Sequence, residues 1–277
     1  MMSSMEIIGY VGALFIGLIM GLTGSGGSIL SIPILAYLFH YDEKTATAYS
    51  LFIVGATALF GAVQSVYNRL VNYKSVWIFG IPAVIGVLLV RRIVMPALPE
   101  VLFHVMGFEV TRRMFIFGLF GLLMLSAAYT MLHKSKMHLS EIDKKSFEFH
   151  PIMLSEGFFL GVFMGLIGAG GGFLIVPALM LIAKLPIKDA IATSLVIVCL
   201  NCLIGFFLGD FFTLEIDWYF LLKFVVISLV GIFIGGILTK FVHNEQLKKL
   251  FGYFIIIMAL LIFVIEFFIR ADCPINE

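Results

Sequence analysis

An uncharged run of 35 residues, Ile7–Tyr41, lies close to the start of this sequence. Seven further runs also lack Asp, Glu, Lys and Arg: Thr45–Asn68, Trp77–Val90, Met114–His133, Gly157–Ala183, Ala190–Gly209, Phe224–Thr239 and Leu250–Ile265. About 20 apolar residues in a helix cross the roughly 30 Å hydrocarbon core of a bilayer. Lipid offers no partner to an open backbone, so these runs are expected to be helical. The sequence therefore predicts an all-α polytopic membrane protein with eight hydrophobic segments.

The composition supports this fold class and excludes several others. Of the 277 residues, 61% are hydrophobic and 13% are charged, whereas soluble domains carry about 25% charged residues. The net charge of +1 gives no field that would attract nucleic acid, and three cysteines are too few for a disulfide framework. The first basic residue is Lys44. The first segment therefore lacks the basic start of a secretory signal peptide and is expected to remain in the mature protein.

The two halves of the sequence resemble each other at a constant offset of 144 residues. Gly17–Pro33 (GLIMGLTGSGGSILSIP) aligns without a gap with Gly161–Pro177 (GVFMGLIGAGGGFLIVP). The offset also pairs Lys44 with Lys188, Ala46 with Ala190, Ser50 with Ser194 and Gly61 with Gly205. The shared register predicts a duplicated four-segment unit, with repeat 1 in residues 1–133, a polar linker in 134–150 and repeat 2 in 151–277. Duplication is the usual construction of secondary transporters, whose substrate site lies where the repeats meet.

Each repeat opens with a segment that a glycine cluster should interrupt. As one helix, Ile7–Tyr41 would be about 52 Å long, far more than a bilayer needs. Glycine costs about 1 kcal/mol in a helix interior and permits positive φ, so a break is expected at Gly24–Ser28 and at Gly168–Gly172. A broken segment either crosses the membrane or folds back as a re-entrant hairpin, which makes the repeats inverted. The Lys and Arg distribution favours inversion, although four arginines between residues 91 and 113 count against it.

The start of the second half-helix in each segment is a candidate anion site. Its free backbone N–H groups lie at the positive end of the helix dipole, and two such sites could face one another near the bilayer midplane. Close packing of helices through small residues is the alternative explanation of the glycines. Nearby hydroxyl and amide side chains either bind the anion or bond their own or a neighbouring helix. The candidate substrate-binding residues are Gly24, Ser25, Gly26, Gly27, Ser28, Ser50, Thr57, Gly168, Ala169, Gly170, Gly171, Gly172, Thr193, Ser194 and Asn201.

The duplicated pattern Gly-Leu-x-Gly-x-Gly-Gly-x-x-Leu-x-x-Pro, followed by Lys-x-Ala-x-Ala-x-Ser, resembles the TauE/SafE sulfite exporter family over nearly the whole chain. The resemblance implies a secondary carrier in a bacterial inner membrane for a small sulfur-containing anion such as sulfite or an organosulfonate. The small anionic substrate and the lipid bilayer are the expected partners. H⁺ and Na⁺ are candidates for a coupling ion, which the sequence does not name. The segment Arg91–Arg113 is longer than its counterpart in the second half, and no function is predicted for it.

Other functions remain open from the residues alone. An anion channel would use the same site, and a carrier for another small anion such as a carboxylate would share the fold. An accessory subunit would have no transport role. No paired base and nucleophile, no metal-ligand spacing and no Gly-x-x-x-x-Gly-Lys-Ser/Thr motif occurs. We therefore expect neither an enzyme nor an ATP-driven pump, and we expect no cofactor and no nucleic-acid partner.

Overall fold

The computed structural model describes residues 4–24, 27–99, 101–105, 108–132, 152–168, 171–181, 183–238 and 244–264. The α-helices are α1 (Ser4–Thr23), α2 (Ser28–Pro33), α3 (Glu43–Tyr67), α4 (Tyr73–Ser75), α5 (Ile81–Leu89), α6 (Met95–Ala97), α7 (Arg112–Leu132), α8 (Ile152–Ile167), α9 (Gly172–Leu181), α10 (Ile187–Gly205), α11 (Trp218–Leu238) and α12 (Asn244–Val264). Four π-helical segments continue helices, namely η1 (Ile34–Leu38), η2 (Val76–Gly80), η3 (Val90–Val94) and η4 (Phe206–Asp210). The strands are β1 (Val101–Val105) and β2 (Phe108–Thr111).

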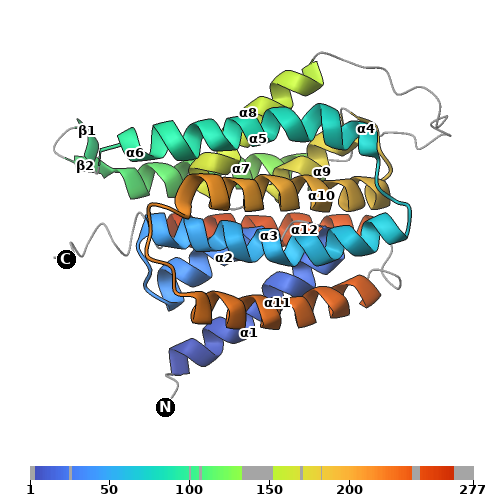
Figure 1. Ribbon diagram of the computed structural model, residues 1–277, viewed down its shortest axis with the longest axis horizontal. Helices are drawn as coiled ribbons and strands as arrows, with labels where there is room; N and C mark the ends of the chain where they lie inside the picture. Colours follow the sequence, from blue (N-terminus) through green and yellow to red (C-terminus); the bar gives the residue numbers. More distant parts are fainter. Residues whose placement is uncertain are drawn as a thin grey trace.

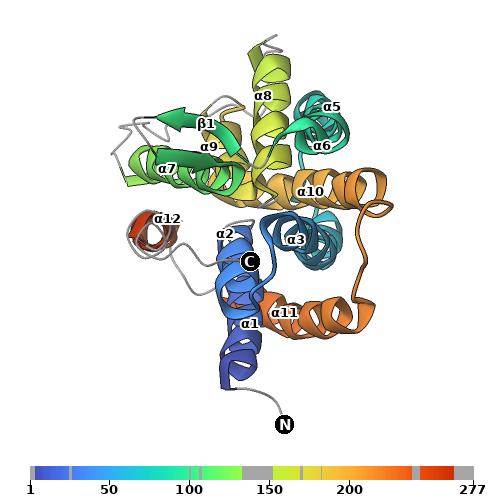
Figure 2. The ribbon, with the colours of Figure 1, turned by 90° about the vertical axis from the view of Figure 1, so that its left-hand side faces the viewer.

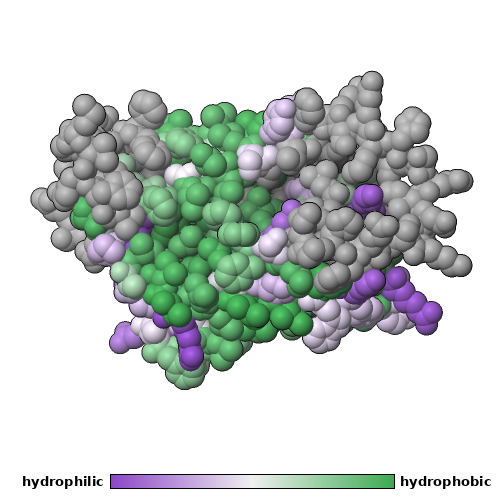
Figure 3. Space-filling model, turned by 90° about the horizontal axis from the view of Figure 1, so that it is seen from above, coloured by the Kyte–Doolittle hydropathy of each residue, from purple (hydrophilic) through white to green (hydrophobic). Residues whose placement is uncertain are grey.

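All eight hydrophobic segments that the sequence predicts are helical in the described residues, which confirms the fold class. Among the described residues, five helical stretches are long and apolar enough to cross a membrane: Glu6–Thr23, Glu43–Tyr67, Tyr73–Ala97, Ile187–Asp210 and Trp218–Leu238. Large apolar side chains such as Trp77 and Phe159 are exposed, as expected where lipid rather than water is the solvent. The central part of the face in Figure 3 is hydrophobic, and hydrophilic side chains lie mainly toward its two ends.

The first broken segment is a helical hairpin. α1 ends at Thr23, and α2 with η1 returns alongside it, so that a Cβ on Gly9 would overlap the ring of Phe39. The rings of Tyr10 and Phe39 also meet, with centroids 5.7 Å apart. The chain thus reverses at the glycine cluster instead of continuing across. This geometry agrees with the re-entrant alternative for the first segment.

The two halves of the chain exchange helices. α1 packs along α11, and α8 packs along α5, so the first helix of each half lies against the other half. Figure 2 shows the result as two groups, one with α1, α2, α3, α11 and α12 and the other with α5, α6, α7, α8, α9 and α10. The groups meet where α3 packs on α10 and α7 packs on α12. α3 and α10 run antiparallel, as Figure 1 shows, with Gly55 beside Cys202 and Gly61 beside Leu195.

Glycines allow these exchanged helices to touch backbone to backbone. A Cβ on Gly17 would overlap the carbonyl of Ser228, and a Cβ on Gly161 would overlap the carbonyl of Ala83. Small residues that let helices approach closely are the usual basis of helix association in membranes, where lipid is as apolar as the side chains. Gly17 and Gly161 are separated by 144 residues, so matching positions in the two halves make matching contacts. The duplication of the chain itself stays a prediction, and this correspondence supports it.

A two-stranded antiparallel hairpin departs from the all-helical expectation. β1 and β2 pair Phe103 with Val110 and Val105 with Phe108. The hairpin lies within Arg91–Arg113, the segment for which the sequence predicted no function, and it joins α6 to α7. The hairpin leaves the fold class unchanged, because all eight predicted apolar segments are helical in the described residues.

Candidate glycine-break site

The first break reverses the chain at Gly24, whose φ is +88°. A Cβ there would lie 2.8 Å from Cγ2 of Ile191 and 3.0 Å from its carbonyl oxygen, in the first turns of α10. Gly27 caps α2 and packs on the carbonyl of Ile16, and Ser28 is buried. Ser25 and Gly26, which the sequence also assigns to the site, lie outside the described residues. The first break therefore rests on an apolar residue of the opposite half.

The second break reverses the chain at Gly168, whose φ is +73°. A Cβ there would overlap Cβ of Thr47 in the first turns of α3, and it would overlap Nη2 of Arg91. Gly171 packs on Met164, and Gly172 begins α9. Ala169 and Gly170 lie outside the described residues. Thr47 and Ile191 differ by the offset of 144, so both breaks contact the same position of opposite halves.

The two breaks do not face one another. Gly24 lies against the start of α10 and Gly168 lies against the start of α3, and these two helices are antiparallel. The breaks are therefore near opposite ends of the α3–α10 pair. The expectation of two sites meeting at the midplane is not met in this conformation. The physical reason is the exchange of helices, which places each break against the first turns of a helix from the other half, α10 for Gly24 and α3 for Gly168.

A buried arginine stands at the second break. The side chain of Arg91 is 1% exposed, and its Nη1 lies 3.1 Å from Oδ2 of Asp210. The same Nη1 donates to Oγ1 of Thr47 at 3.2 Å. Arg91 lies in the π-helical η3 and Asp210 ends the π-helical η4, and single π-helical turns are frequent at functional sites. Gly209 leaves room for the arginine stem, since a Cβ there would lie 2.8 Å from Cβ of Arg91.

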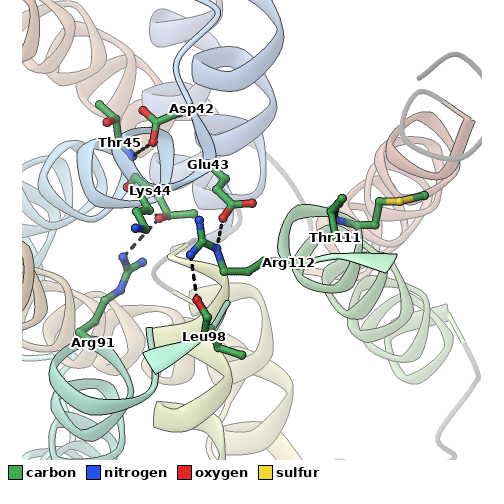
Figure 4. A network of polar contacts seen from close by, with 10 residues as sticks. Asp42, Glu43, Lys44, Thr45, Arg91, Leu98, Thr111 and Arg112 are labelled. Atoms are coloured by element: carbon green, nitrogen blue, oxygen red, sulfur yellow. Dashed lines mark hydrogen bonds and ion pairs between the residues drawn. The ribbon is translucent and has the colours of Figure 1, made fainter. Parts of the chain in front are cut away.

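Other charges surround this end of α3, as Figure 4 shows. Asp42 caps α3 by accepting from the backbone N–H of Thr45 at 3.4 Å. The buried carboxylate of Glu43 pairs with Arg112, which also donates to the carbonyl of Leu98 at 3.1 Å. The matched lysines Lys44 and Lys188 each lie at the start of a helix, since α3 begins at Glu43 and α10 begins at Ile187.

The hydroxyl groups near the breaks mostly donate to the protein itself. Ser31 donates to the carbonyl of Ser28 at 2.7 Å, so Ser50 is the donor in the bond between the two serine hydroxyls. Thr57 donates to the carbonyl of Ile53 at 2.7 Å, and Ser194 donates to that of Ile191 at 2.8 Å. A hydroxyl has one proton to donate. In this conformation these side chains therefore stabilise their own helices or neighbours rather than presenting a donor to an anion.

The remaining polar candidates differ from each other. Thr193 accepts from the backbone N–H of Asn72 at 3.0 Å, and so ties down the connection before α4. Asn201 is 1% exposed, and its Nδ2 lies 3.6 Å from Sδ of Met164, the residue that packs on Gly171. Its Oδ1 has no hydrogen-bond partner among the described residues. Asn201 thus lies next to a residue of the second break, and its place on the substrate path stays a prediction.

Sequence reasoning missed Arg91. The residue stands in the tail of the third segment, next to Arg92, and a charge at a segment end is usually assigned to the interface. Arg92 fits that assignment, since it is exposed and its Nε donates to the carbonyl of Leu208 at 3.1 Å. The acidic Asp210, placed where the sixth segment ends, is the one sequence signal that could have suggested a buried pair.

Comparison with known proteins places the chain in a family. Residues 10–262 match the family model described as sulfite exporter TauE/SafE. The chain belongs to this family. A "Probable membrane transporter protein" of Xylella fastidiosa (strain 9a5c) is 30% identical to this TauE/SafE member over 263 residues, which cover 90% of this chain and 91% of the relative. The "Probable membrane transporter protein YunE" of Bacillus subtilis (strain 168) is 28% identical over 252 residues, 84% of this chain and 88% of the relative. No solved structure matches.

Family membership decides the class of function. This TauE/SafE member is a multi-pass membrane transporter and not an enzyme. A transporter of this family moves a small molecule and resides in a lipid bilayer.

Proposed function

We propose that the protein is a secondary permease for a small sulfur-containing anion, sulfite or an organosulfonate, and that the two glycine breaks supply its binding groups. One observation carries the proposal. In both halves a glycine at positive φ ends one helix and is pressed against the first turns of a helix from the other half. Broken helices at corresponding positions of two repeats are the best sequence pointer to a transport site, and their N-terminal ends favour anions.

The exchange of helices refines how alternating access would work. If the sequence halves rocked against each other, the backbone contacts of α1 with α11 and of α8 with α5 would break. Rocking of the two spatial groups in Figure 2 leaves those contacts intact and moves the interfaces between the groups, of which α3–α10 and α7–α12 are the largest. We therefore assign the moving bodies to these groups, each of which holds one of the two breaks.

Counterflow in proteoliposomes tests the proposal. Liposomes loaded with unlabelled sulfite should transiently accumulate external ³⁵S-labelled sulfite, because a carrier exchanges substrate through one site. Labelled methanesulfonate tests the organosulfonate arm in the same way. An anion channel would let the label equilibrate without overshoot. Accumulation of labelled acetate, with none of either sulfur anion, would reject the substrate class and leave a carboxylate carrier.

The breaks are tested by a matched pair of glycine variants. Gly168→Leu should abolish counterflow, since the added side chain would overlap Thr47 and Arg91 at a positive φ. Gly80→Ala is the control, because the nearest heavy atom to its Cβ is 3.8 Å away. Normal counterflow by a folded Gly168→Leu variant would show that the site lies elsewhere.

A further inference from the structure

The guanidinium group of Arg91 holds one unused edge. Nη1 makes both of its polar contacts, to Asp210 at 3.1 Å and to Thr47 at 3.2 Å. Nε and Nη2 have no hydrogen-bond partner among the described residues, although the side chain is 1% exposed. Nε and Nη2 are the two donors of the side-on edge of the planar fork, the pair that binds two oxygens of one anion. A buried donor without a partner costs about 1–3 kcal/mol, more when charged, so two on one edge call for a ligand.

This edge is directed at the second break. A Cβ on Gly168 would overlap Nη2, and α9 begins four residues later at Gly172 with the positive end of its dipole. The hydroxyl groups of Ser31, Ser50, Thr57 and Ser194 have already donated their protons elsewhere. At the second break, within the part of the chain that the structure describes, Arg91 has two donors left to offer.

We propose that Arg91 binds the transported anion at the second break through Nε and Nη2, and that the site accepts small oxyanions with two oxygens on one face, such as sulfite, sulfonate and carboxylate groups. This inference rests on the proposed function and names the binding residue of that site. Thr47 is the positioning residue, since it holds Nη1 and lies beside Gly168. The anion must share Arg91 with Asp210, the carboxylate that neutralises it in the empty protein.

The buried arginine lies at the second break and has no counterpart at the first. The helices α5 and α11 correspond at an offset of 145 residues, because Gly161 packs on Ala83 where Gly17 packs on Ser228. At this offset the counterpart of Arg91 is Gly236. A Cβ there would lie 3.3 Å from the side-chain oxygen of the neutral Gln64. The residues that match Thr47 and Asp210 are Ile191 and Val66. The first break therefore offers no arginine to an anion, and a single strong binding position per chain follows.

Binding of ³⁵S-labelled sulfite to the purified full chain in detergent tests the proposal, with thermal unfolding followed in parallel. Arg91→Gln should weaken sulfite binding by about 10- to 100-fold, the loss expected for hydrogen bonds to a charged group. Arg92→Gln is the matched control and should bind sulfite as the wild type does. Asp210→Asn should tighten binding by about tenfold, because the anion then has the whole charge of Arg91 to itself. Arg91→Lys should restore binding only in part, since an ammonium group keeps the charge without the fork.

A double variant separates binding from folding. Arg91→Gln alone leaves Asp210 buried without its partner, which can unfold the protein. Arg91→Gln with Asp210→Asn removes both charges and should keep a melting temperature near that of the wild type, yet still bind sulfite weakly. Wild-type sulfite affinity in this double variant would overturn the role of Arg91 and leave the proposed function standing. A site that binds acetate but not sulfite, and does so through Arg91, would uphold the inference and reject the sulfur substrate. No binding of sulfite, methanesulfonate or acetate by the wild type would reject both.

Discussion

The two glycine breaks have similar backbone conformations, but the side chains around them differ in chemistry. In each break the chain reverses at a glycine with positive φ. Each of these glycines lies against the fifth residue of a long helix from the other half, α10 for the first break and α3 for the second. That residue is the apolar Ile191 at the first break and the polar Thr47 at the second. Hydroxyl side chains surround the first break, whereas Arg91, Asp210 and Asn201 surround the second. The same backbone arrangement thus carries different side chains at the two breaks.

The difference indicates which features the scaffold requires and which features serve a ligand. Glycines recur in both halves because positive φ and backbone contact between helices leave no room for a Cβ. The buried ion pair does not recur, so packing does not require it. Buried charges are expensive in a membrane and are usually kept for function. We therefore assign a structural role to the glycines of both breaks, and recognition of the anion's charge to the second break.

Glycine substitutions should separate the two breaks most strongly. Gly24→Ala and Gly168→Ala should each destabilise the protein by at least about 2 kcal/mol, because both glycines have positive φ and tight neighbours. Sulfite affinity should fall more than about tenfold only in Gly168→Ala, which displaces the arginine edge. Thermal unfolding and sulfite binding measure the two effects. An affinity loss in Gly24→Ala alone would reverse the assignment.

The matched residues Thr47 and Ile191 sharpen the comparison. Thr47→Val removes the acceptor for Nη1 of Arg91 while keeping the shape of the side chain, so sulfite affinity should fall about tenfold. Ile191→Val should cost about 0.5–1.5 kcal/mol of stability and leave affinity unchanged. Titration of both variants with labelled sulfite measures the difference. Equal affinities in the two variants would mean that Thr47 does not position Arg91.

Asn201 and its counterpart Thr57 form a third pair. Asn201→Leu removes a buried amide with an unpartnered oxygen, so stability should be unchanged or higher, while sulfite counterflow should slow about three- to fivefold. Thr57→Val removes a bond to the carbonyl of its own helix and should leave counterflow as it is. A faster rate in Asn201→Leu would place the amide outside the substrate path.

The hydroxyl groups should have the smallest effects. Ser50→Ala and Ser194→Ala each remove a donor that bonds within the protein, so each should cost about 1 kcal/mol of stability. Sulfite affinity should change less than about twofold in either variant, as expected for groups whose protons are used elsewhere. A larger loss in Ser50→Ala would show that a hydroxyl group also binds the anion.

Local rules predicted the elements well and the contacts poorly. Run length and glycine placement located the helices and both breaks, because bilayer thickness and backbone conformation act over a few residues. That the chain reverses at each break was one of two alternatives. Ser50 and Ser194 were sound candidates by register, but which neighbour takes a hydroxyl proton depends on distances that spacing does not contain. The β1–β2 hairpin also escaped prediction, since its strands have only five and four residues, too few for a periodic pattern to stand out.

The sequence by itself determined a multi-pass helical protein, two glycine breaks 144 residues apart and membership of a transporter family. Only the tertiary structure decided that the halves exchange helices and that Arg91 meets Gly168. The reason is physical. Helices in lipid associate through close fits of small residues, such as Gly161 on Ala83, rather than through a hydrophobic pattern that can be counted along the chain. That fit carries an arginine from a segment end into the protein interior, beside a break 77 residues away.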